Sequence, residues 1–137
     1  MAAAWLNKGD RRKLNGFQNR CLRTIWGIKA AYVSRVSNAI VLQRTGQRPL
    51  TDLLQKQQLL LYGRVARQSD ENPMRAATFG PGSLRAAVDI YIRKVGRPRL
   101  AWATEVGKFA LQAAGGYQKL EKKNRSETAW RGVVEAF

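Results

Sequence analysis

The sequence predicts an all-α protein of about five or six short helices, arranged as a compact or bipartite bundle with basic outer faces. Apolar residues recur every three or four positions in several segments, which is the spacing of one helix face. No segment alternates apolar and polar residues in the way a strand would, and glycine and proline breakers separate the helical segments. With 137 residues, the chain has the length of one domain. We therefore expect a single helical domain over residues 1–137, with a candidate sub-division near residues 80–82.

The N-terminal half is expected to hold three helices. Asp10 is placed to cap the first helix, and Gly27 lies near its end. Its apolar stripe, which we expect to be buried, consists of Leu14, Phe17, Cys21, Ile25 and Ile28. A shorter helix should begin after Ser37, and a third should run over residues 50–67. Gly63 interrupts the third stripe and favours close packing of another helix at that point.

The C-terminal half is expected to hold shorter segments followed by two clear helices. Residues 74–79 have room for one or two helical turns, and a helix capped by Ser83 should follow. Two apolar stripes come later, the first over residues 102–113 and the second over residues 126–137. The tryptophans on these stripes, which we expect in the core, are Trp102 and Trp130.

The charge balance of the chain points to a polyanionic partner. There are 25 Lys and Arg residues against 9 Asp and Glu, a net charge of +16. Self-repulsion on this scale destabilises a compact chain unless a polyanion neutralises it. Nucleic acid is the first candidate, and an anionic membrane surface is the second. Arginine outnumbers lysine, 16 to 9, which suits RNA as well as packed interfaces, because guanidinium forks bind phosphate bidentately and stack on bases.

Several classes of chemistry are excluded or disfavoured by composition. The chain has no histidine and one cysteine, so histidine-based catalysis, an internal disulfide and a cysteine-based zinc site cannot be built. The acidic residues are scattered, and no phosphate-binding glycine loop is present. No apolar run reaches the length of a membrane-spanning helix. We therefore expect no enzyme activity, no metal, no cofactor, no small-molecule substrate and no transmembrane segment.

The candidate nucleic-acid-binding residues are basic side chains in three segments. They are Arg11, Arg12, Lys13, Arg20 and Arg23 in the first helix, Arg97 and Arg99 in a basic loop, and Lys122, Lys123 and Arg125 near the C-terminus. The loop around Gly96 resembles the Gly-Arg-Pro centre of an AT-hook, but Val95 stands where a basic residue usually precedes the glycine. We expect this loop to lead into a helix and to contact phosphate.

Four short motifs, taken in order, resemble a known region of retroelement proteins. They are the Gln-x-x-Cys-Leu-Arg stretch at 18–23 with its Gly27-Ile28 ending, the Arg-Thr-Gly at 44–46, the Gly-Arg-Val-Ala-Arg at 63–67 and the Gly-Arg-Pro at 96–98 followed by Trp102. In this order they resemble the region C-terminal to the reverse transcriptase domain in non-LTR (LINE-type) retrotransposon polyproteins, over about residues 14 to 106. Arg64 stands where that family usually has histidine.

The resemblance implies a helical module that sits against template RNA or DNA. The polymerase domain with its catalytic aspartates and the endonuclease domain are absent from this sequence, so the chain looks like a free-standing descendant of the C-terminal region. None of the matching residues is catalytic in the family.

Our leading hypothesis is a non-catalytic, RNA-binding structural protein derived from a retroelement. We expect it to be a subunit of a large ribonucleoprotein such as an organellar ribosome, with ribosomal RNA and neighbouring proteins as partners. The expected location is the mitochondrion, with the nucleus as the alternative. One alternative function is a nucleic-acid-binding fragment that still acts with a reverse transcriptase. A third is a basic scaffold subunit of a membrane or acidic protein complex, which ranks last because the predicted stripes are narrow enough to be used up by the core.

Overall fold

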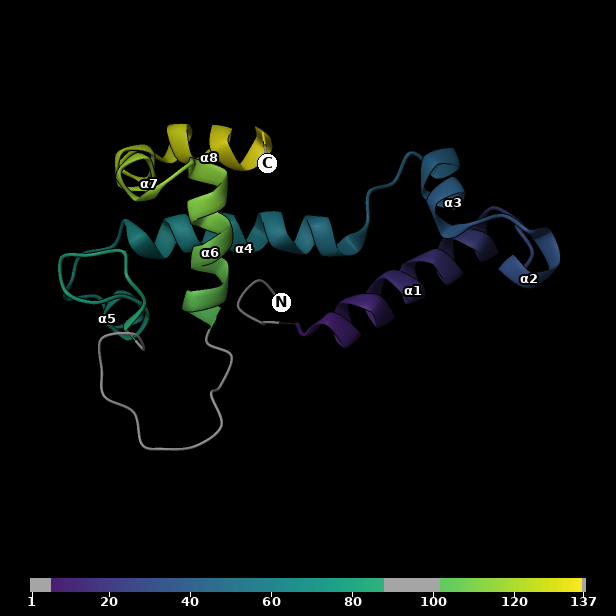
Figure 1. Cartoon of the computed structure of the whole chain (residues 1–137), viewed down its shortest axis with the longest axis horizontal. Helices are drawn as coiled ribbons and strands as arrows, with labels where there is room; N and C mark the ends of the chain where they lie inside the picture. The colour runs from purple at the N-terminus through teal and green to yellow at the C-terminus, as the bar shows by residue number, and fades with distance from the viewer. Residues whose placement is uncertain (1–5, 88–101, 137) are drawn as a thin grey trace, which may run out of the picture. The chain divides into compact units, whose positions relative to one another are not determined.

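The computed structural model describes residues 6–87 and 102–136, and in these residues it contains eight helices and no strand (Figure 1). They are α1 (Lys8–Ile25), α2 (Ala31–Ser34), α3 (Asn38–Thr45), α4 (Leu50–Ala66), α5 (Pro73–Thr78), α6 (Trp102–Ala114), α7 (Tyr117–Asn124) and α8 (Glu127–Ala136). The all-α prediction is confirmed. The helix count exceeds the expected five or six because α2 and α7 were not predicted.

The chain divides into two units within α4. The N-terminal unit is Leu6–Gln55, and the C-terminal unit is Lys56–Phe137. The first turns of α4 therefore belong to one unit and the rest of the helix to the other. Residues 80–82, where the sequence placed a candidate sub-division, lie within the C-terminal unit.

Helix ends in the N-terminal unit are set by side-chain caps and one glycine. The side-chain oxygen of Asn7 accepts a hydrogen bond from the Asp10 amide at 2.9 Å, so Asn7 caps α1 and the prediction of Asp10 as the cap was wrong. Ser37 caps α3 as predicted, because its hydroxyl accepts from the Ile40 amide. Gly46 ends α3 with a φ of +63°, a left-handed conformation that costs glycine little.

The start of α4 is capped by amide side chains of α1. The Gln18 side chain accepts from the Leu50 amide at 2.9 Å and donates to the Arg48 carbonyl at 2.8 Å. Asn15 accepts from the Thr51 amide and donates to the Thr51 hydroxyl. These bonds satisfy amides that a helix N-terminus leaves without partners. They join two helices more than thirty residues apart in sequence.

The apolar stripe predicted for α1 is not buried. Phe17 is 58% exposed and Ile25 is 75% exposed, and Cys21 is half-buried. The buried side chains of this helix are Gln18, Asn19 and Arg23 instead. The apolar stripe is present on α1, but the face that carries Gln18, Asn19 and Arg23 points inward. Gln18 caps α4, and Arg23 binds backbone carbonyls of the segment that follows α1.

The C-terminal unit has an apolar core shared by four helices. It consists of Leu59, Tyr62, Val65 and Ala66 of α4, Val106, Ala110 and Ala114 of α6, Leu120 of α7, Trp130 and Val134 of α8, and Phe79, which directly follows α5. Tyr62 packs edge-to-face on Phe79, with ring centroids 5.1 Å apart. The core position predicted for Trp130 is confirmed at 1% exposure, and Trp102 packs against the core while half-buried.

Gly63 allows α8 to approach α4 closely, as the sequence predicted. A β-carbon at this position would overlap the Trp130 indole ring and lie 3.0 Å from the Asn124 side-chain oxygen. The indole nitrogen of Trp130 donates to the Leu59 carbonyl at 2.8 Å. Because Leu59 lies one turn before Gly63, the missing side chain is what opens the way to that carbonyl.

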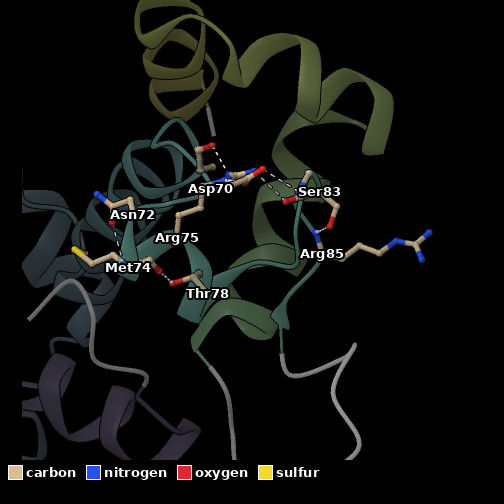
Figure 2. A network of polar contacts seen from close by, with 9 residues as sticks. Asp70, Asn72, Met74, Arg75, Thr78, Ser83 and Arg85 are labelled. Atoms are coloured by element: carbon tan, nitrogen blue, oxygen red, sulfur yellow. Dashed lines mark hydrogen bonds and ion pairs between the residues drawn. The ribbon is translucent and has the colours of Figure 1, made fainter.

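A polar network around Arg75 fixes the segment between α4 and residue 87 (Figure 2). The guanidinium donates to the Asp70 carboxylate and to the Ala66 carbonyl, each at 2.6 Å, and to the Ser83 carbonyl at 3.4 Å. The second Asp70 oxygen accepts from the Gly82 amide at 3.3 Å. One arginine thereby caps the C-terminal end of α4 and holds the following loop.

The helix predicted from Ser83 is wrong over residues 83–86. These residues form bends and one isolated bridge between Phe79 and Ala86, and Ala87 is in a 3-10 helical conformation. The Ser83 hydroxyl accepts from the Arg85 amide two residues on, a local turn that competes with helix capping. The rest of that predicted helix lies outside the described residues.

Candidate nucleic-acid interface

Positive charge is divided equally between the two units. Residues 6–55 contain ten basic residues against two acidic ones, a net charge of +8. Residues 56–137 contain fifteen against seven, again +8. The three ion pairs among the described residues are Arg75–Asp70, Lys108–Glu105 and Arg131–Glu127, all in the C-terminal unit. Most of the excess charge is therefore not neutralised by acidic side chains of the described residues.

The basic residues predicted on α1 fall into two groups. Arg12, Lys13 and Arg20 are exposed. Arg11 is half-buried, and its side chain donates to the Leu6 carbonyl at 3.2 Å. The exposed group can meet a polyanion, whereas Arg11 also holds the chain that precedes the helix.

Arg23 is corrected from a binding residue to a structural one. It is 8% exposed, and its guanidinium donates to the Val36 carbonyl at 2.6 Å and to the Lys29 carbonyl at 3.0 Å. It also donates to the Asn38 side chain at 3.1 Å. These bonds hold the segment between α1 and α3 around the Arg23 guanidinium. The carbonyls of Lys29 and Val36 lie outside the helices, so they accept from Arg23 and not from helix amides.

The basic residues predicted on the C-terminal side of the chain are placed around the end of α7. Lys122 and Arg125 are exposed. Lys123 is half-buried and donates to the Ala114 carbonyl at the end of α6, at 3.4 Å. Basic residues at a helix C-terminus also favour the helix dipole. The remaining predicted residues, Arg97 and Arg99, lie outside the described residues.

An open groove in the C-terminal unit gathers three arginines from separate segments. Arg67 follows α4, Arg75 lies on α5 and Arg125 follows α7, and all three line a cavity of about 520 Å³. Arg67 donates to the Asn124 side chain at 3.4 Å, which holds it beside Arg125. Glu121 is the acidic residue among the described lining residues. We call this cavity the arginine groove.

A second, smaller cavity of about 180 Å³ adjoins the first and shares Arg67 with it. Arg64 of α4 and Arg131 of α8 also line it. Arg131 is paired with Glu127 at 3.0 Å, whereas Arg64 and Arg125 form no ion pair with the described residues. We call Arg64, Arg67, Arg125 and Arg131 the arginine cluster.

Sequence reasoning found one member of this cluster, Arg125, and missed three. Arg64 lies on α4 and Arg67 follows directly after its last residue, and their spacing of three residues places them on the same side of the helix end. That signal was available, but nothing local showed that α8 would bring Arg131 to the same place. The convergence depends on Gly63 and Trp130, which hold α8 against α4.

The side chains of the cluster have the chemistry that anion binding requires. Guanidinium groups donate several hydrogen bonds in a fixed plane and keep their charge at every physiological pH. No group of three or more His, Cys, Asp or Glu side chains gathers in the described residues. Within residues 6–87 and 102–136, no helix combines the length and the apolar character needed to cross a bilayer.

The described residues thus define an all-α, strongly basic protein with an arginine-lined groove in its C-terminal unit. No family model, curated protein or solved structure matches the chain.

Proposed function

We propose that this protein binds RNA as a non-catalytic structural subunit of a ribonucleoprotein. The observation that carries the proposal is the arginine cluster, where side chains from α4, α8 and the end of α7 line two adjoining cavities with few acidic neighbours. Arginine pairs of this kind suit phosphate oxygens, which accept bidentate hydrogen bonds. The exposed Arg12, Lys13 and Arg20 of α1 supply a second basic surface.

The particle we propose is an organellar ribosome, and the location is the mitochondrion. Small, arginine-rich, ordered chains without catalytic groups are typical of ribosomal subunits. The resemblance to the C-terminal region of LINE-type polyproteins supports a retroelement origin and contact with nucleic acid. It equally supports a nuclear protein that acts beside a reverse transcriptase, which is the alternative.

RNA binding is tested by neutralising Arg64 and Arg125, which form no ion pair with the described residues. Each phosphate contact to a single strand contributes about −0.7 to the slope of log affinity against log salt. The Arg64→Gln/Arg125→Gln variant should therefore lower the magnitude of that slope by about 1.4 and weaken binding at low salt by about tenfold. The measurement is fluorescence anisotropy with a single-stranded RNA between about 50 and 300 mM salt.

Arg85→Gln is the matched control, because Arg85 is exposed in the same unit and lines neither cavity of the cluster. Its side chain points away from the Arg75 network (Figure 2). It should change affinity by less than about twofold. Affinity that is flat with salt, or an equal loss in the control, would contradict binding through the arginine cluster.

Membership of a particle is tested by sedimentation of the native protein from lysate at moderate salt, with and without RNase. A resident subunit should co-sediment with ribosomal particles at fixed stoichiometry and lose that sedimentation after RNase treatment. Slow sedimentation would favour the retroelement fragment instead. A fast particle that RNase does not alter would favour the scaffold function.

A further inference from the structure

Helix α1 carries an apolar row on its exposed face. Phe17, Cys21 and Ile25 follow one another at four-residue spacing, and with Arg20 and Thr24 they line an open groove of about 560 Å³. Phe17 is 58% exposed and Ile25 is 75% exposed. We call Phe17, Cys21 and Ile25 the α1 ridge. Apolar side chains grouped in this way mark interaction surfaces more often than isolated ones do.

The N-terminal unit leaves Phe17 and Ile25 of the ridge exposed and buries Cys21 only in part. The inward face of α1 presents Gln18, Asn19 and Arg23, and the fully buried apolar residue of Leu6–Gln55 is Val41. An amphipathic helix that closes its own core has the opposite arrangement, with the apolar stripe inward. The outward stripe therefore fits a surface that a partner covers.

The shape of the ridge fits a helix. Residues four apart form the rows that interdigitate when two helices pack, and this row is about 12 Å long at 1.5 Å per residue. Cys21 and Ile25 have no aromatic face, so the row as a whole is not a platform for stacked bases. Complexes in which an amphipathic helix binds a groove use apolar residues at this spacing of three or four positions.

The charge beside the ridge specifies an acidic partner. Lys13 and Arg20 are both exposed and lie seven residues apart, which places them on the same side of α1. The acidic residues of the unit, Asp10 and Asp52, occupy the first turns of α1 and α4. A second copy of this unit would bring another charge of +8 against it, so self-association is opposed.

We infer that the α1 ridge docks an amphipathic helix of an acidic partner protein, with apolar residues on the ridge and carboxylates beside Lys13 and Arg20. This interface is separate from the arginine cluster, which belongs to the other unit, but it uses Lys13 and Arg20 of the second basic surface, which would then face the partner protein and not RNA. It also revises the expectation that every stripe would be used up by the core.

Cys21, the single cysteine of the chain, is a built-in reporter at the centre of the ridge. The probe is a synthetic amphipathic helix with leucines along one face and glutamates along one flank. Two control peptides carry the same residues in shuffled order, or lysine in place of glutamate. The glutamate peptide should bind about tenfold more tightly than either control, and it should slow alkylation of Cys21 by N-ethylmaleimide several-fold.

Two variants of the full-length protein sharpen the test. Ile25→Ser, at an exposed position that the fold does not need, should weaken binding of the glutamate peptide about tenfold while helicity by circular dichroism stays unchanged. Lys13→Glu/Arg20→Glu should reverse the preference, so that the lysine peptide binds more tightly. Retention of this pattern after Arg64→Gln/Arg125→Gln would separate the docking surface from the RNA site.

Four results would overturn the inference. Equal binding of the shuffled peptide would show that the ridge lacks helix specificity. Protection of Cys21 by a single-stranded RNA or by anionic phospholipid vesicles, but not by the glutamate peptide, would assign the ridge to those ligands. Concentration-dependent self-association that protects Cys21 would assign it to a second copy. A charge-reversed variant that keeps the original preference would remove the electrostatic argument.

Discussion

At the scale of single residues, the identity of one side chain decides a tertiary contact at two positions, Gly63 and Arg23. Gly63 lets the Trp130 indole reach the Leu59 carbonyl, and this contact holds α8 against α4. Arg23 shows the reverse case, since a charged residue with the pattern of a binding side chain closes a loop instead. In both cases the contact partner is a backbone carbonyl that the sequence pattern around the residue does not indicate.

Gly63→Ala should destabilise the C-terminal unit by about 3 kcal/mol, because the added methyl group overpacks the site and displaces a buried hydrogen bond. Urea unfolding followed by tryptophan fluorescence measures the change. Gly132→Ala on α8 is the control, since a β-carbon there meets nothing within 4 Å. Alanine is the better helix former, so the control should be neutral or stabilising by up to about 1 kcal/mol. A neutral Gly63→Ala would show that the helices are not in this close contact.

At the scale of elements, polar side chains from neighbouring helices fix the two ends of α4. Gln18 and Asn15 cap α4 from α1, and Arg75 caps the other end of the same helix. Both ends of α4 are thus fixed by residues from other helices. The Asp70 carboxylate is part of the second joint, and its hydrogen bond from Arg75 lowers the pKa of that carboxyl.

The lowered pKa of Asp70 predicts a pH-dependent contribution to stability. A carboxyl whose pKa is lower in the folded state stabilises the fold above its unfolded pKa of about 3.9, and that contribution is lost as the pH falls through the folded value. Asp70→Asn should therefore lower the melting temperature at pH 7, and its difference from the wild type should shrink as the pH falls from about 5 to 3.

Glu71→Gln is the control for this experiment, because it removes a carboxylate from the adjacent exposed position without touching Arg75. It should leave the melting temperature nearly unchanged across the same pH range. A difference between Asp70→Asn and the wild type that stays constant with pH would point to a lost shape or packing contact rather than to the charge.

At the scale of the whole molecule, the dominant feature is an excess of positive charge carried equally by both units. Each holds +8, and like charges within a unit oppose its compact state. The N-terminal unit meets this repulsion with polar joints and one fully buried apolar residue, Val41. The C-terminal unit has the larger apolar core, so the two are expected to differ in stability when no partner is present.

A polyanion should stabilise the whole chain more than simple salt does. Polyuridylate at a hundredfold excess over its Kd should add about 2.7 kcal/mol to the free energy of unfolding, because it binds the folded state. Sodium chloride at the same ionic strength only screens the charges, and its effect on the melting temperature should be smaller. Differential scanning calorimetry compares the two. An equal rise with both would indicate screening without binding.

The sequence predicted the helices that have both an apolar stripe and a clear breaker. The bounds of α4, α6 and α8 agree with the prediction to within a residue or two, and α3 begins directly after Ser37 as predicted. Helix α2 was missed because four residues are too few to show periodicity, and α7 because Leu120 is its single buried apolar residue. The arginine cluster was less predictable, since Arg125 and Arg131 meet Arg64 and Arg67 only through tertiary packing.

The polar interior of the N-terminal unit has a consequence for how long the protein survives in the cell. A segment with few buried apolar side chains opens locally at low cost, and proteases cut chains in their open state. Under the proposed function, a copy bound to RNA and to a protein neighbour would be held closed, whereas a surplus copy would open repeatedly and be degraded. Turnover of this kind would match the supply of the protein to the number of particles that need it.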